Sequence, residues 1–109
     1  MAAWRPSVEP SRQEQLLLKR LGRTRKLFGF LRRHRHRLLN EAFQKELAGM
    51  YSDSKAGSPQ IEPARLCLAI LLQAYLGVSD AEAVEMTVVD LRWQMVLDAL
   101  GATKPVFSQ

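Results

Sequence analysis

The sequence predicts an all-α protein, a small bundle of about five to six helices around one buried central helix. Two observations favour this fold class. No stretch alternates apolar and polar residues for long enough to form a half-buried strand. Apolar residues instead recur at steps of three and four, and capping residues stand where these stretches begin. The 109 residues suffice for one small domain with a modest core.

The N-terminal part predicts a loose terminus followed by a helix. Residues 1–10 include two prolines, so we expect a flexible N-terminus in which Trp4 is the one side chain that could dock. Ser11 and Glu14 have the three-residue spacing of a capping box, so a helix should begin there. Gly22 is a suitable residue to end that helix.

Two further helices are expected in the next part of the chain. Apolar residues in 23–31 favour a helix, although Gly29 lowers its helix propensity by about 1 kcal/mol. Residues 32–37 read RRHRHR, and charges this dense repel one another, so we expect this stretch not to pack into a core. Asn40 can cap a helix over residues 41–51, whose apolar residues fall on one side.

The segment 63–76, PARLCLAILLQAYL, is the most apolar of the chain and predicts the buried central helix. Only two of its fourteen residues are strongly polar, so it should face other helices on nearly every side. Pro63 suits the first helical position, and Gly77 can take the left-handed conformation that ends a helix. Residues 52–62, which precede it, predict a loop.

Two more helices are predicted before the C-terminus. Ser79 and Glu82 repeat the capping-box spacing, and the helix that they begin forms a helix-turn-helix-like hairpin with the central helix. Asp90 can cap a last helix, whose apolar residues keep to one face until Gly101 ends it. The tail, residues 102–109, is expected to be turn-like.

Charge divides the chain into two parts. Residues 1–40 hold eleven Lys and Arg against two acids, a net charge of +9, whereas residues 41–109 hold five against nine, a net charge of −4. Such asymmetry is typical of contact with nucleic acid or another anionic surface. We therefore divide a single helical domain, 11–109, into a basic arm (11–38), a helical core (39–101) and the tail.

The basic arm supplies the candidate DNA-binding residues. Nine cations fall between Leu18 and Leu38 with no acid among them. Arginine and lysine neutralise phosphates and release condensed counterions, which gives salt-dependent binding with little sequence preference. The alternatives are a solvated basic face and, less favoured, a membrane-surface segment. The nine residues are Lys19, Arg20, Arg23, Arg25, Lys26, Arg32, Arg33, Arg35 and Arg37.

Catalytic and metal-binding chemistry is not indicated. The acids fall at helix starts or on polar faces, where capping and solvation account for them. No phosphate-binding glycine-rich loop and no nucleophile elbow is present. Cys67, the single cysteine, should be a buried small apolar residue, and with two histidines it makes no credible zinc site. We expect no enzyme activity, metal, cofactor or small-molecule substrate.

Membrane insertion and export are not indicated either. No apolar run reaches the roughly 18 residues that a bilayer span requires, and residues 1–11 lack the apolar centre of a signal peptide. The sequence thus predicts a cytoplasmic, nucleoid-associated protein with no membrane partner.

The predicted hairpin has roughly the lengths of a DNA-reading helix-turn-helix. Its second helix reads DAEAVEMTVV, with Asp80, Glu82 and Glu85 and no Lys or Arg. The phosphates that line a DNA groove would repel these carboxylates. We therefore expect the hairpin to serve packing rather than major-groove recognition.

Several phrases in the C-terminal two thirds of the chain are specific. They are FQKELAGMY at 43–51, IEPARL at 61–66, LLQAYLGVSDAEAVEMTVVDLRWQMVL at 71–97 and PVFSQ at 105–109. In these phrases the chain resembles the N-terminal domain of InsH-like insertion-sequence transposases. The resemblance implies a small helical domain that precedes an RNase H-like catalytic domain with an Asp-Asp-Glu metal triad. It also implies a role in binding or positioning the DNA ends of the element.

The sequence departs from that family pattern in its extent. In such transposases the FSQ phrase leads into a further helix, whereas this sequence stops at Gln109. We therefore expect a chain truncated before the catalytic domain and catalytically inert. Asp80, Glu82 and Asp90 are not substitutes for the missing triad.

The leading hypothesis is a non-catalytic N-terminal domain or fragment of a bacterial transposase that assists DNA binding during transposition. The rival is a protein-interaction or oligomerisation module, in which helices around Trp93 and Leu97 expose an apolar face that a catalytic domain or a second copy covers. A third possibility is a remnant without a selected function.

Overall fold

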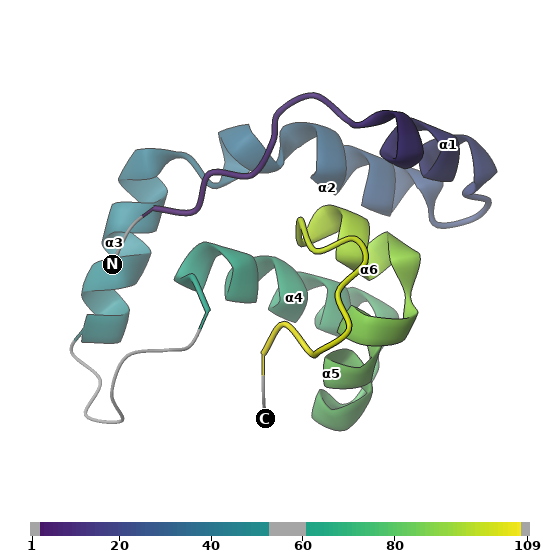
Figure 1. Ribbon diagram of the computed structural model, residues 1–109. Coiled ribbons are helices and arrows are strands. Elements are labelled where there is room, and N and C mark those ends of the chain that lie inside the picture. Colours follow the sequence, from purple (N-terminus) through teal and green to yellow (C-terminus); the bar gives the residue numbers. More distant parts are fainter. Residues whose placement is uncertain (1–2, 53–60, 108–109) are drawn as a thin grey trace.

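The computed structural model describes residues 3–52 and 61–107, without the side chains of residues 51 and 52. In these residues it contains six α-helices and no strand, which confirms the all-α prediction (Figure 1). The helices are α1 (Arg12–Arg20), α2 (Arg25–Leu38), α3 (Glu41–Ser52), α4 (Pro63–Leu76), α5 (Asp80–Val89) and α6 (Leu91–Val96).

The predicted caps at the starts of α1, α3, α5 and α6 and at the end of α4 act as expected. The side chains of Ser11 and Ser79 accept the backbone N–H of Glu14 and Glu82, and both capping boxes are complete. Gly77 closes α4 with a φ of 68°, in the left-handed region. Since each cap involves groups only a few positions apart, the short-range sequence determines where these helices begin and end.

The centre of the protein is α6 and not, as predicted, α4. α6 contacts α1, α2, α4 and α5, and it lies between α2 and α4 (Figure 1). Trp93, Met95, Val96 and Leu97 have no exposed surface. The apolar face around Trp93 and Leu97 that the interaction hypothesis invoked is therefore already covered by the protein itself.

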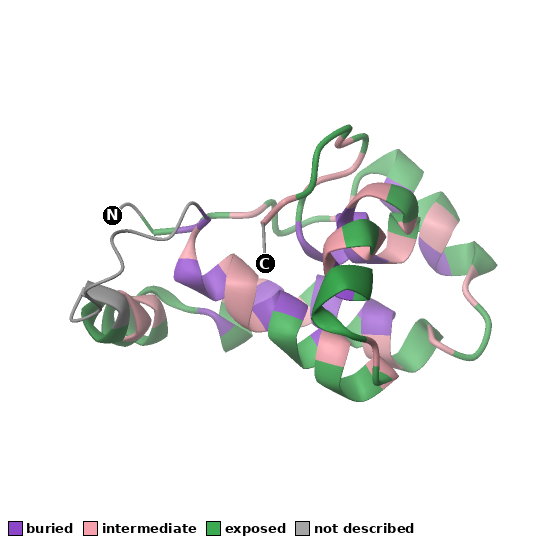
Figure 2. Ribbon diagram, turned by 90° about the horizontal axis from the view of Figure 1, so that it is seen from below, coloured by how far each residue is buried: buried purple, intermediate pink, exposed green. Residues whose placement is uncertain are grey.

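Only one side of α4 is buried. Ala64, Leu68 and Leu72 face the core, whereas the side chains of Ile70 and Tyr75 are 52% and 67% exposed. Figure 2 shows how buried and exposed positions alternate along the helices. The expectation that this helix is enclosed on nearly every side is wrong. α3, α5 and α6 contact this helix and cover its inner side.

The last helix ends earlier than predicted. It stops at Val96, and the chain then turns through Asp98, whose φ is 57°, to reach Gly101. The carbonyls of Met95 and Val96 would accept the N–H groups of residues 99 and 100 if the helix continued. They accept hydrogen bonds from Nη1 of Arg35 at 2.9 Å each, and the Met95 carbonyl also accepts the backbone N–H of Asp98 at 3.3 Å. A tertiary contact has thus replaced the last helical turn.

The N-terminal segment packs against the helices, although the sequence predicts a loose terminus. Trp4 is only 5% exposed. Its backbone N–H donates to Oε1 of Gln44 at 2.6 Å, and its carbonyl accepts from Nε2 of Gln44 at 2.9 Å. From there the segment runs along α2 to the start of α1 (Figure 1). Docking of Trp4, which the sequence allowed, is confirmed.

The predicted loop 52–62 falls mostly outside the described residues. In the tail, residues 102–107 contain bends but no helix. The backbone N–H of Val106 donates to Oγ1 of Thr87 and ties this tail to α5. Among the described helices, none is long and apolar enough to cross a membrane alone; α4 and α5 meet that test only as a pair bent by 110°.

Candidate nucleic-acid interface

The nine predicted DNA-binding residues lie on α1, on the connection after it and on α2. α2 extends from Arg25 to Leu38, so the whole RRHRHR stretch is helical. A helix turns by about 100° per residue, so these cations cannot all face the same way. The structure consequently separates them into an inner pair and an outer set.

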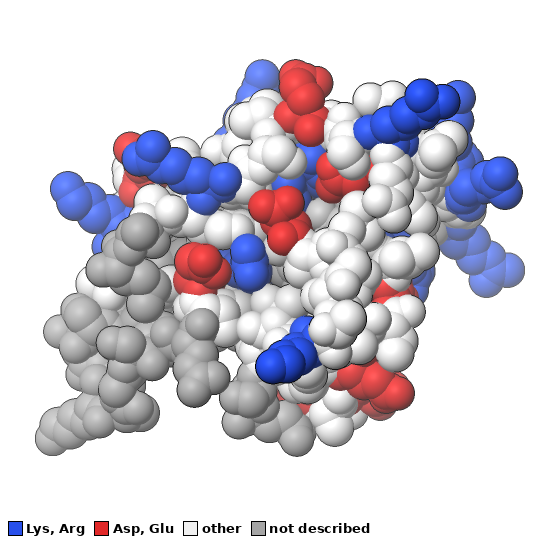
Figure 3. All heavy atoms as spheres, viewed as in Figure 1, with Lys and Arg blue, Asp and Glu red and all other residues white. Residues whose placement is uncertain are grey.

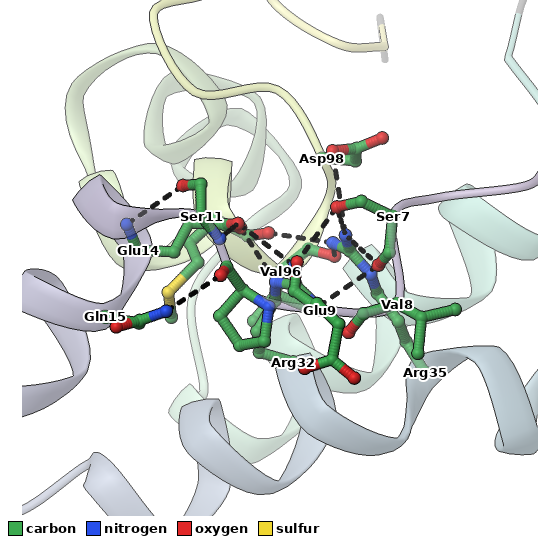
Figure 4. Close-up of polar contacts among 12 residues, drawn as sticks. Ser7, Val8, Glu9, Ser11, Glu14, Gln15, Arg32, Arg35, Val96 and Asp98 are labelled. Atoms are coloured by element: carbon green, nitrogen blue, oxygen red, sulfur yellow. Dashed lines mark hydrogen bonds and ion pairs between the residues drawn. The ribbon is translucent and has the colours of Figure 1, made fainter.

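Arg32 belongs to the inner pair and has no exposed surface. Its Nε donates to Oε2 of Glu14 at 2.7 Å and its Nη2 to Oε1 at 3.0 Å, a two-pronged ion pair between α2 and α1 (Figure 4). The remaining guanidinium donors reach the backbone carbonyls of Ser7, Val8 and Glu9. The N-terminal segment is thus held against α2 by one arginine.

Arg35 is the second inner cation and is also fully buried. Its Nη1 donates to the carbonyls of Met95 and Val96 at the C-terminal end of α6, where the helix dipole favours a positive charge (Figure 4). Its Nη2 donates to the carbonyl of Ser7 at 3.0 Å and lies 3.6 Å from Oδ1 of Asp98. Burial, with the nearby charge of Arg32, lowers the pKa of Arg35 to about 10.

Two predictions about this stretch need correction. Residues 32–37 do pack into the core through Arg32 and Arg35, because backbone carbonyls and acids accept hydrogen bonds from both guanidinium groups. Of the nitrogens in these two groups, only Nε of Arg35 is buried without a partner among the described residues. In this structure neither group can reach a phosphate. The burial of these two arginines could have been predicted from the sequence, since they recur at helical spacing with Phe28 and Leu31 on one side of α2.

The outer set consists of seven exposed cations. In the part of the chain that the structure describes, no acid forms an ion pair with any of them. Lys and Arg side chains project around α1 and the turn that follows it, at the upper right of Figure 3. The seven residues are Lys19, Arg20, Arg23, Arg25, Lys26, Arg33 and Arg37.

Two adjoining hollows lie among these cations. They have volumes of about 450 and 400 Å³ and share Leu18, Arg25 and Arg33 in their walls. We call the combined depression the α1–α2 groove. It is positively charged along its length and contains no acidic residue in its lining. The other lining residues are Pro10, Gln15, Lys19, Lys26, Gly29, Phe30 and His34.

The α4–α5 hairpin has helix-turn-helix proportions but the opposite charge. The two helices bend by 110° across the turn, within the range of about 90–120° for that motif. Asp80, Glu82 and Glu85 are all exposed on α5. Acidic side chains gather at the lower edge of the molecule, over α5 (Figure 3). This acidic surface disfavours entry of α5 into a DNA groove.

A metal centre is not evident in the part of the chain that the structure describes, where no three His, Cys, Asp or Glu residues are grouped closely enough to hold an ion. Cys67 is half-buried on α4, and burial raises the pKa of its thiol. It therefore remains protonated and unreactive at neutral pH.

Comparison with known protein families gives one match. Residues 17–109 match the family described as transposase domain (DUF772), which covers the C-terminal part of α1, all of α2 to α6 and the described tail. No curated protein and no solved structure matches the chain. The family match extends over more than half of the sequence and includes most of the basic arm. The chain therefore belongs to the transposase domain family DUF772.

Proposed function

We propose that this chain is a non-catalytic, DNA-contacting N-terminal domain of an InsH-like insertion-sequence transposase. The observation that carries the proposal is the outer set of seven exposed cations, which no described acid neutralises. Membership of a transposase domain family supports DNA as the partner, because transposases act on DNA. The acidic α5 supports binding through the α1–α2 side rather than through the hairpin.

The physical basis is neutralisation of phosphates. Each Lys or Arg that contacts a phosphate releases counterions, so the logarithm of the binding constant falls against the logarithm of salt with a slope of about −0.9 per contact. Contacts of this kind position a protein on DNA without reading its sequence. The two inner arginines support the surface indirectly, since they fix α2 against α1 and α6.

The test is a titration of the protein against a labelled DNA duplex at rising salt. A double variant, Arg25→Gln with Arg33→Gln, removes two cations from the α1–α2 groove. The matched control, Lys45→Gln with Lys104→Gln, removes two exposed cations that lie outside the groove. We expect the first variant to weaken binding at least about tenfold and to reduce the salt slope by roughly two, and the control to change little.

Three results would contradict the proposal. They are an absence of binding at about 50 mM salt, binding that does not depend on salt, and equal losses in the two variants. Thermal unfolding of both variants checks that each is folded when its binding is measured.

A second candidate function is self-association or docking on a catalytic domain. The observation that favours it is the exposed side of α4, where Ile70, Leu71 and Tyr75 are uncovered and uncharged. Light scattering at rising protein concentration tests self-association. A mass that increases with concentration in the wild type and not in an Ile70→Lys, Tyr75→Lys variant would support it, and a strict monomer would count against it.

A further inference from the structure

An aromatic pair stands within the α1–α2 groove. The rings of Phe30 and His34 have centroids 4.6 Å apart and are tilted by 44°. Both residues line the hollow of about 400 Å³, together with the cations Arg25, Lys26 and Arg33. Phe30 is 53% exposed although it is a large apolar side chain. The groove thus combines positive charge with an accessible aromatic surface.

This combination matches what unpaired nucleotides require. Proteins that bind single-stranded DNA pair a positively charged groove, which follows the backbone, with aromatic side chains on which bases stack. In a fully paired duplex the faces of the bases are already stacked on one another, so an aromatic ring on the protein surface has no free base to cover. Phosphate contact alone would need the cations but not the exposed ring of Phe30.

The lining of the hollow also contains uncharged residues. Gly29 and Leu18, which are uncharged, line the same hollow as the aromatic pair. The Leu18 side chain comes within 3.7 Å of the position that a Cβ on Gly29 would take. A base on the ring of Phe30 would therefore rest beside apolar atoms, while its phosphates lie near Arg25, Lys26 and Arg33.

We propose that Phe30 and His34 form a stacking platform for an unpaired base, so that the α1–α2 groove binds single-stranded or locally opened DNA more tightly than fully paired duplex. This proposal rests on the proposed function, since it assumes that the α1–α2 side contacts DNA. Beyond DNA contact itself, the proposal specifies single-stranded or locally opened DNA as the preferred form, and Phe30 and His34 as the residues that cause the preference. A plain helical contact between residues four apart would stabilise α2 but would not affect DNA binding.

The experiment compares a labelled single strand with a duplex of the same sequence and length. The variants are Phe30→Ala, Phe30→Trp and, as a control, Leu16→Ala, because Leu16 is also 53% exposed and lies on α1 outside the groove lining. We expect Phe30→Ala to weaken single-strand binding roughly five- to hundredfold and duplex binding less than about twofold. Phe30→Trp should retain single-strand binding, and Leu16→Ala should change neither.

A second readout reports stacking directly. A strand that contains 2-aminopurine should lose fluorescence when it binds the wild type, and this quenching should be reduced in Phe30→Ala. A strand whose bases are replaced by abasic sites keeps its phosphates, so it should bind wild type and Phe30→Ala with about equal affinity. Unfolding midpoints of the variants show whether any loss of binding results from lower stability instead of lost stacking.

The outcomes separate the two proposals. If neither single strand nor duplex binds, the proposed function itself is overturned. If both bind with salt dependence but Phe30→Ala behaves as Leu16→Ala does, or weakens both forms equally, the stacking platform is overturned and the proposed function stands. A selective loss with the single strand, restored by tryptophan, supports the platform.

Discussion

Arg32 and Glu14 form an ion pair inside the protein, with Nε of Arg32 2.7 Å from Oε2 of Glu14. The same carboxylate accepts the backbone N–H of Ser11 at 2.8 Å and so completes the capping box of α1. One acid thus begins a helix and neutralises a buried cation on the next helix.

The first prediction concerns removal of this arginine. Arg32→Met should destabilise the protein by about 3–5 kcal/mol, because it leaves the buried carboxylate of Glu14 without its partner. Urea unfolding measures the loss. Arg33→Met is the matched control, since Arg33 is exposed and adjacent, and it should change stability by about 0.5 kcal/mol or less. Equal losses in the two variants would contradict the structural role of Arg32.

The second prediction concerns pH. Burial alone would raise the pKa of Glu14, but hydrogen bonds from Arg32 and from the backbone N–H of Ser11, with the charge of Arg32, outweigh it and hold the pKa below 4.5. Because the folded pKa lies below the unfolded one, the pair stabilises the protein above about pH 4.5 and this stabilisation is lost as pH falls through the folded value.

Urea midpoints measured between about pH 6 and pH 3 test this dependence. Glu14→Gln should lower stability at neutral pH and flatten the decline at acid pH. Some decline should remain, because Asp90 also has a lowered pKa: burial raises it, and the hydrogen bonds and charge of Arg92 lower it by more. An unchanged decline in Glu14→Gln would show that this carboxylate is not responsible.

The third prediction concerns Gly29, a glycine in the interior of α2. A Cβ at this position would meet its nearest neighbour, Cδ2 of Leu18, at 3.7 Å, an ordinary contact distance. Gly29→Ala should therefore stabilise the protein by about 0.5–1 kcal/mol through helix propensity. Gly77→Ala is the contrasting variant, since a φ of 68° is unfavourable for alanine, and it should destabilise. Thermal unfolding compares the two.

The fourth prediction concerns the N-terminal segment. Trp4→Ala should cost about 3–5 kcal/mol, because Trp4 is almost fully buried and belongs to the core cluster. Arg5→Ala, its neighbour, removes an exposed ion pair with Glu41 and should cost less than about 1 kcal/mol. Chemical unfolding and limited proteolysis of the first ten residues measure both effects. If the N-terminal segment is dispensable for folding, the two variants will have the same stability.

The charge pattern of the sequence predicted only some of the exposed cations of the candidate site correctly. Seven of the nine cations named from the sequence lie on the surface, but Arg32 and Arg35 serve the interior. Their guanidinium groups donate to carbonyls of Ser7 and Val96, residues 25 or more positions away in the chain. The local sequence contains no information on such partners, so a count of charges cannot separate an inner from an outer arginine.

The α1–α2 groove was not predicted from the sequence either. Phe30 appeared in the sequence as one apolar residue among several near Gly29, equally consistent with a core position. Its exposure follows from the rotation of α2, which turns Phe28 and Leu31 inward and Phe30 outward. That rotation depends on where α1 and α6 lie.

The sequence by itself determined the all-α class and the starts of α1, α5 and α6, together with the end of α4. The reason is that caps such as Ser11, Gly77, Ser79 and Asp90 act on backbone groups within a few positions. Only the tertiary structure decided that α6 is the centre, that α4 is exposed on one side and that two arginines are buried. Those outcomes depend on contacts such as Arg35 with Met95, 60 positions apart, which form when the helices pack together.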